Sequence, residues 1–161
     1  MSNEAKEILD RYWDLLLPVK VDDIANRCGI CIRHLDESLC QNFSGMASID
    51  KDSGDKVIYY NPNESANRQR FTIAHELGHH VLGHTMYGDM FRDNFKDGIY
   101  HPEEVAANSF AAEILMPSRA VLRLAGSKGF KTEYDLAVLF NVSIDAFHWK
   151  LVNLGIIDNG R

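Results

Sequence analysis

The sequence NRQRFTIAHELGH, residues 67–79, decides the fold, because it contains the pattern His75-Glu76-Leu77-Gly78-His79. Two residues four positions apart on an α-helix are offset by about 40° around its axis and about 6 Å along it. The imidazoles of His75 and His79 therefore point in the same direction and can bind one metal ion. Glu76 lies beside them, where its carboxylate can take a proton from water. Two metal ligands and a general base are catalytic groups that a zinc peptidase needs.

The residues around this pattern predict a helix that begins near Ser65 and ends at Gly83, with one buried side. Gly78 is a poor helix former, which favours the close approach of another backbone or a metal ligand at that position. A buried side and a glycine at this position favour a metal site over the alternative of a surface helix that carries histidines by chance. The apolar stripe consists of Phe71, Ala74, Gly78 and Leu82.

A second pair of histidines, His80 and His84, is also spaced by four residues. No glutamate follows His80, and Gly83 is expected to end the helix before His84. We therefore interpret both as surface or rim residues.

Composition fits an ordinary protein of one domain. The chain has 161 residues, 45% of them hydrophobic and 25% charged, and this length is enough for a single core. Its net charge of −6 argues against a protein that coats nucleic acid. No apolar run approaches the ~18 residues of a membrane span, and the polar, acidic N-terminus does not resemble a secretory signal. We expect a cytoplasmic protein with no membrane partner.

Three cysteines, an odd number, fit a reducing compartment. Cys28 and Cys31 form a C-x-x-C pattern, with His34 and Cys40 nearby, which raises the alternative of a second metal site. Cys28 precedes a predicted helix end, however, and Cys31 alternates with apolar residues as in a strand. Buried small side chains are the favoured interpretation.

The remaining pattern predicts an α+β protein. The segment before residues 65–83 can contribute an edge strand that pairs with substrate backbone, bordered by Tyr59 or Tyr60, or it can be an ordinary internal strand. Residues 84–101 show no period and form either a lid over the metal cleft or irregular packing. Helices are expected over 3–17, 21–28, 102–116, 118–126, 132–140 and 143–154, and strands over 30–35, 44–49 and 56–60, the last two as a hairpin.

A zinc ion held by two histidines needs a third protein ligand. No third histidine stands at the spacing H-E-x-x-H-x-x-G-x-x-H, so the candidates are Glu103, Glu104 and Glu113. Glu113 falls away from the apolar face of its helix, whereas Glu103 and Glu104 both border it. Asn108 lies four residues after Glu104 and can hydrogen-bond a ligand histidine, which favours Glu104.

The stretches RQRFTIAHELGHHVLGH and EVAANSFAAEILMP closely resemble the ImmA/IrrE-type metallo-endopeptidases. The resemblance extends backward through PVKVDDIANRCGICI, GMASI and VIYYNP, and forward through LAVLFNVSIDAFHWKLVNLGII. It implies that His75, His79 and Glu104 bind Zn²⁺ and that Glu76 is the catalytic base. It also implies one zincin-like domain over residues 1–161, with a small three-stranded sheet packed on the metal-binding helix. Its expected parts are N-terminal helices and sheet (1–64), metal-site helices with their loop (65–116) and C-terminal helices (117–161).

The family resemblance further implies a cytoplasmic endopeptidase that cleaves a helix-turn-helix transcriptional repressor of a mobile element or stress locus. We expect no sensor domain of the kind that some relatives carry, because 161 residues leave no length for one. One alternative is a toxin-like or anti-repressor protein that sequesters its partner with little proteolysis. Another, direct DNA binding by the last helix pair, is disfavoured because only Lys150 is basic within 143–154. Candidates for stabilising the oxyanion remain open, and they are Tyr87, Tyr100, His84 and His101.

Overall fold

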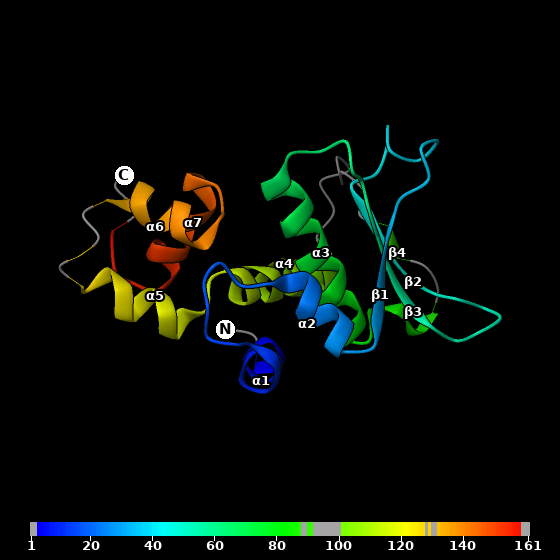
Figure 1. Ribbon diagram of the computed structural model, residues 1–161, viewed down its shortest axis with the longest axis horizontal. Helices are drawn as coiled ribbons and strands as arrows, with labels where there is room; N and C mark the ends of the chain where they lie inside the picture. The colour runs from blue at the N-terminus through cyan, green and yellow to red at the C-terminus, as the bar shows by residue number, and fades with distance from the viewer. Residues whose placement is uncertain (1–2, 88–89, 92–100, 128, 130–131, 159–161) are drawn as a thin grey trace.

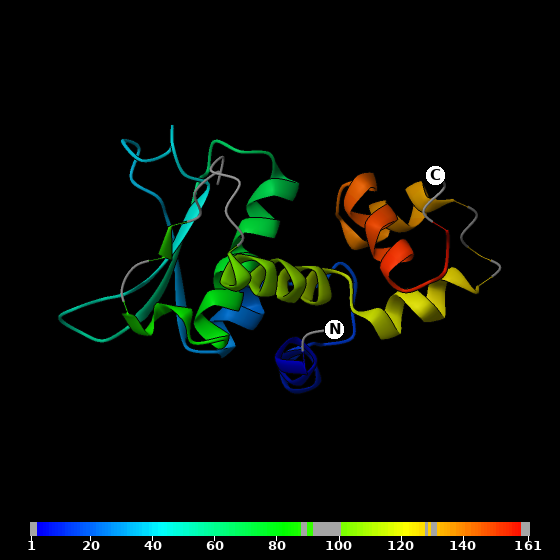
Figure 2. The ribbon, with the colours of Figure 1, turned by 180° about the vertical axis from the view of Figure 1, so that it is seen from behind.

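Two central helices, α3 (Ala66–Val81) and α4 (Pro102–Leu115), lie between a β-sheet and a group of C-terminal helices (Figures 1 and 2). The computed structural model describes residues 3–87, 90–91, 101–127, 129 and 132–158. Together these elements form the α+β fold that the sequence predicts. The other elements are α1 (Asn3–Tyr12), α2 (Val21–Arg27), β1 (Ile30–His34), β2 (Gly45–Ile49), β3 (Lys56–Tyr60), η1 (His84–Tyr87), β4 (Met90–Phe91), α5 (Ser118–Ala125), α6 (Glu133–Phe140) and α7 (Ile144–Asn153).

The sheet has the strand order β1-β3-β2-β4. Strand β3 pairs in parallel with β1 and antiparallel with β2, so the predicted hairpin is confirmed. The two-residue β4 pairs with β2 at Met46 and Ala47 and adds a fourth strand to the three that were predicted. Because β3 lies between β1 and β2, the strand before the HExxH helix is internal, and the edge-strand interpretation is wrong for it.

Helix α1 ends at Tyr12, five residues before the end predicted for it. The Asp14 carboxylate accepts the backbone N–H of Leu16, and Pro18 has no N–H to donate, so the chain leaves the helix here. As a result, Leu16 is 59% exposed instead of lying on the buried side of a longer helix.

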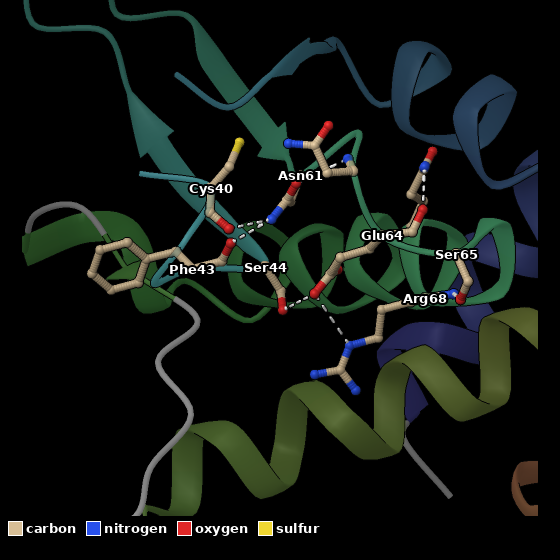
Figure 3. A network of polar contacts seen from close by, with 9 residues as sticks. Cys40, Phe43, Ser44, Asn61, Glu64, Ser65 and Arg68 are labelled. Atoms are coloured by element: carbon tan, nitrogen blue, oxygen red, sulfur yellow. Dashed lines mark hydrogen bonds and ion pairs between the residues drawn. The ribbon is translucent and has the colours of Figure 1, made fainter. Parts of the chain in front are cut away.

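A polar network joins the start of β2 to the start of α3 (Figure 3). The Asn61 side chain donates to the carbonyls of Cys40 and Phe43, at 2.7 and 3.1 Å. The Ser44 hydroxyl donates to Glu64 at 2.7 Å. Helix α3 begins where the Ser65 hydroxyl accepts the backbone N–H of residue 68. The network therefore fixes the first residues of β2 against the N-terminal end of the HExxH helix.

Helices α3 and α4 approach closely at Gly78. A Cβ atom placed there would lie 3.3 Å from Ala107 Cα and 3.1 Å from Phe110 Cδ1, both on α4. The prediction that Gly78 permits a close backbone approach is therefore confirmed. Ala107 and Ala111 are fully buried at this contact. Ala111 and Phe110 belong to one continuous hydrophobic core.

A buried ion pair connects α4 to α7. Lys150 Nζ donates to Glu113 Oε2 at 2.6 Å, and both side chains are 8% exposed. Ser118 donates to the same carboxylate through its backbone N–H at 2.9 Å and its hydroxyl at 2.6 Å. The Glu113 carboxylate thus has a structural role, and the Lys150 ammonium group is not available to a DNA phosphate.

A tight turn joins α6 and α7, which lie where helices were predicted over 132–140 and 143–154. Asn141 adopts the left-handed conformation (φ 53°) at the end of α6. Ser143 then caps α7 by accepting the backbone N–H of Ala146.

The cysteines differ from the expectation of burial. Cys31 is exposed, while Cys28 and Cys40 are half-buried. Cys31 follows the buried Ile30 along β1, so the alternation of the strand turns it toward solvent.

Of the residues predicted as a lid or irregular loop, 88–89 and 92–100 lie outside the described residues. Residues 84–87 form the short helix η1, and residues 90–91 form β4. Within the described part of the chain, the helices are too short or too polar to cross a membrane.

The buried ion pair generates a test of stability. Lys150→Met should destabilise the protein by about 3–5 kcal/mol, because it leaves the Glu113 carboxylate buried without its cation. The double change Lys150→Met with Glu113→Gln should recover part of this loss, because the amide is neutral and its oxygen can still accept from Ser118. Unfolding in guanidinium chloride measures both, and a single variant as stable as wild type would contradict the structural role of the pair.

Candidate metal centre

Three side chains from α3 and α4 converge in the interior. His75 Nε2 and His79 Nε2 are 3.0 Å apart. Glu104 Oε2 lies 3.1 Å from His75 Nε2, and Glu104 Oε1 lies 3.1 Å from His79 Nε2. The two histidine side chains are 0% and 1% exposed, and that of Glu104 is 13% exposed. Among the described residues, this is the one group of three that could hold a metal ion.

Asn108 orients the first histidine. Its Oδ1 lies 3.0 Å from His75 Nδ1, so that nitrogen carries the proton and donates it to the amide oxygen. His75 therefore presents the lone pair of Nε2 to His79 and Glu104. This is the contact that the spacing of Glu104 and Asn108 predicts.

The ionised state of Glu104 suits a cation. Burial raises the pKa of its carboxyl, but the hydrogen bonds and charges of His75 and His79 outweigh burial and hold the pKa well below its ordinary value. Glu104 also stands in the first turn of α4, where the helix dipole favours negative charge. The other candidates do not join the cluster, because Glu103 is exposed and Glu113 pairs with Lys150.

The donor set fits a divalent metal ion. Tetrahedral ligands at the usual bond lengths of zinc are separated by about 3.4 Å, close to the separations found here. A nitrogen lone pair and an ionised carboxylate held this close in a buried site need a proton or a cation between them. The cluster therefore suggests a metal-binding site formed by two histidines and one glutamate.

Glu76 is fully buried on the side of α3 that faces β2. A Cβ atom on Gly45 would lie 3.2 Å from Glu76 Oε1 and 2.8 Å from the Tyr59 carbonyl, and would also meet Thr72. Gly45 therefore makes the space in which the Glu76 carboxylate and α3 lie against the sheet. Its position at the start of a strand gave no signal of this role in the sequence.

His80 does not lie at the surface, and its interpretation as a surface or rim residue is wrong. It is 3% exposed. Its Nε2–H donates to the Val57 carbonyl at 2.9 Å, and its Nδ1 accepts from the Thr85 hydroxyl at 3.2 Å. Burial lowers the pKa of His80, although the carbonyl partner acts in the opposite direction. His80 thus connects α3 to β3, and it is not part of the cluster of His75, His79 and Glu104.

His84 is half-buried and directly contacts the cluster. Its Nδ1 lies 2.8 Å from His79 Nδ1. Burial and the neighbouring His79 lower the pKa of His84, while Glu103 and Glu104 raise it to a smaller extent. His84 contributes no atom to the three-residue cluster itself.

The candidates for stabilising an oxyanion are only partly described. The side chains of Tyr87 and Tyr100 lie outside the described residues. His101 is half-buried at the N-terminal end of α4, where its carbonyl accepts the N–H of Glu104. The contacts described for His84 and His101 do not select one of the four.

A helix with the HExxH pattern, packed on a small sheet and joined by a glutamate from a second helix, defines a zincin-like fold. Comparison with known proteins agrees with this class. Residues 34–151 match a peptidase family described as the IrrE N-terminal-like domain. The chain is 30% identical over 117 residues to metallopeptidase ImmA of Bacillus subtilis (strain 168). This alignment covers 72% of this chain and 67% of that protein.

The chain therefore belongs to the ImmA/IrrE family, and this membership suggests a metallopeptidase. Among solved structures, it is similar to a Mycobacterium tuberculosis transcriptional regulator, with a TM-score of 0.47 and 16% identity. That alignment covers 92% of this chain, which spans only 45% of the length of the solved chain.

The packing at Gly45 generates a second test. Gly45→Ala should destabilise the protein by about 1–3 kcal/mol, because the added methyl group meets backbone and buried side chains. The control is Gly126→Ala at the end of α5, where the nearest atom would be 3.9 Å away. The control should leave the midpoint of chemical unfolding nearly unchanged, and equal effects of the two changes would refute the close packing.

Proposed function

We propose that this protein is a zinc-dependent endopeptidase in which His75, His79 and Glu104 hold the metal ion. The observation that carries the proposal is the convergence of these three side chains, because the two imidazole Nε2 atoms are 3.0 Å apart and each lies 3.1 Å from one oxygen of the Glu104 carboxylate. We propose zinc as the metal because two imidazoles and one carboxylate match a ligand set of catalytic zinc sites. Glu76, next to one ligand in sequence and fully buried, supplies the general base.

When bound by His75, His79 and Glu104, a zinc ion would supply the acidification of water and the polarisation of the scissile carbonyl group. Glu76 takes the proton of the attacking water, and the same carboxyl group later delivers it to the leaving amine. His75 stays oriented through Asn108, so its Nε2 lone pair remains directed at the site. Glu104 stays ionised and leaves the site with one negative charge to balance the metal.

The proposed substrate is a specific protein partner, a helix-turn-helix transcriptional repressor of a mobile element or stress locus. Support comes from family membership, because ImmA/IrrE-type endopeptidases typically act on such repressors. Direct DNA binding is not part of the proposal, since the one lysine of α7 is buried against Glu113. The proposed location of the reaction is the cytoplasm, and the whole chain is proposed to work as one metallopeptidase domain.

The ligand assignment has a matched pair of variants. Glu104→Gln removes the carboxylate charge from the cluster, whereas Glu103→Gln changes an exposed neighbour in the same helical turn. We expect Glu104→Gln to weaken zinc binding by more than the about 100-fold that an outer-shell change costs. Zinc affinity by chelator competition should stay near wild type in Glu103→Gln, and the opposite ranking would reassign the third ligand.

The general base is tested by Glu76→Gln. This variant should bind zinc as wild type does, because Glu76 is not a ligand, and should lose about 10²–10⁴-fold in cleavage rate. The substrate to use is a purified candidate helix-turn-helix repressor, with cleavage followed by mass spectrometry.

The same variant separates cleavage from sequestration. If the protein acts by gripping its partner, Glu76→Gln should still relieve repression while leaving the repressor intact. If it acts by proteolysis, the variant should bind the repressor but fail to relieve repression. Undiminished cleavage by Glu76→Gln would refute the assignment of the base.

A further inference from the structure

The two histidines of the cluster are held through their Nδ1 atoms by different partners. His75 Nδ1 faces an amide oxygen of Asn108, and His79 Nδ1 faces another imidazole, that of His84, at 2.8 Å. An amide oxygen only accepts a hydrogen bond, so the direction of the first contact is fixed. An imidazole nitrogen can donate or accept, so the direction of the second contact depends on the site around it.

The geometry at Nε2 decides that direction. His79 Nε2 lies 3.0 Å from His75 Nε2 and 3.1 Å from Glu104 Oε1. A neutral imidazole has one N–H and one lone pair, and a cation can bind only the lone pair. If His79 binds a metal ion through Nε2, its proton therefore sits on Nδ1. The nitrogen of His84 that faces it must then carry a lone pair.

We propose that His84 is a positioning residue for the metal site: its Nδ1 accepts the Nδ1–H of His79 and holds the Nε2 lone pair of His79 toward Glu104. This inference rests on the proposed function, in which His79 is a metal ligand. Ligand histidines almost always donate their second N–H to such a partner, and its loss typically weakens metal binding about 10–100-fold. Here a second histidine takes the place that a carboxylate or carbonyl usually fills.

The end of α3 makes this contact possible. On a continuous helix, a residue five positions after His79 would lie about 140° around the axis from it and could not reach its ring. Helix α3 ends at Val81, and Gly83 adopts a left-handed conformation with φ 78°. The chain then turns so that His84 begins η1 with its ring centroid 5.1 Å from that of His79 and the ring planes at 62°.

The experiment compares two replacements of His84. Asn carries an oxygen near the position of the imidazole Nδ1 and can accept the same hydrogen bond, whereas Leu has a similar shape and cannot. We expect His84→Leu to weaken Zn²⁺ binding about 10–100-fold in chelator competition, and His84→Asn to stay close to wild type. The control is His148→Leu on α7, whose ring pairs with Glu133 away from the cluster and should not affect zinc.

A second measurement needs no substitution. Nitrogen chemical shifts of the histidine rings in the zinc-loaded wild-type protein report which nitrogen carries each proton. We expect a protonated Nδ1 on His79 and an unprotonated Nδ1 on His84. The reverse arrangement would overturn the proposal even if the variants fold poorly.

The outcomes separate this inference from the proposed function. Equal zinc affinity in wild type and His84→Leu, or an equal loss in the Leu and Asn variants, would overturn the role of His84 and leave the peptidase proposal intact. The expected zinc affinities together with no peptidase activity would support His84 and refute the function. A wild-type protein that binds no zinc would refute both.

Discussion

The close approach of α3 and α4 is the constraint on which the site depends. Gly78 has no side chain, so the backbone of α4 comes within contact distance at Ala107. This approach brings Glu104 to within 3.1 Å of both His75 and His79. A side chain at position 78 would press against Ala107 and Phe110 and so oppose the approach that brings Glu104 to the two histidines.

Each end of α4 carries a buried or half-buried glutamate with a distinct role. Its first turn supplies Glu104, which the helix dipole and two histidines keep ionised. Its last turn supplies Glu113, which is buried with Lys150 and ties α4 to the C-terminal helices. One helix carries both glutamates. The C-terminal helices therefore help to hold Glu104 in place, although they supply no residue to the cluster of His75, His79 and Glu104. On the other side, Gly45 and the polar network before α3 hold the HExxH helix against the sheet.

Most elements could be predicted because their signals are local. The three longer strands and the helices over 66–81 and 102–115 follow period, proline and capping signals within a few residues. The misses involve partners distant in sequence. The burial of His80 depends on the Val57 carbonyl, 23 residues earlier. Glu113, predicted to fall away from the apolar face, is buried because it pairs with Lys150, 37 residues later. The end of α1 was missed for a local reason, since Asp14 bonds to the backbone in place of the next helical turn.

The sequence by itself determined the class of site, since a four-residue spacing on a helix places two imidazoles on one side whatever surrounds them. It also determined the α+β class through periodicity, and it placed Asn108 and Glu104 on the same side of one helix. Only the tertiary structure decided which glutamate meets the histidines, that β3 is internal, and that His84 faces His79 once α3 has ended. These outcomes depend on how separate elements cross and where the chain turns back, and local sequence spacing does not contain that information.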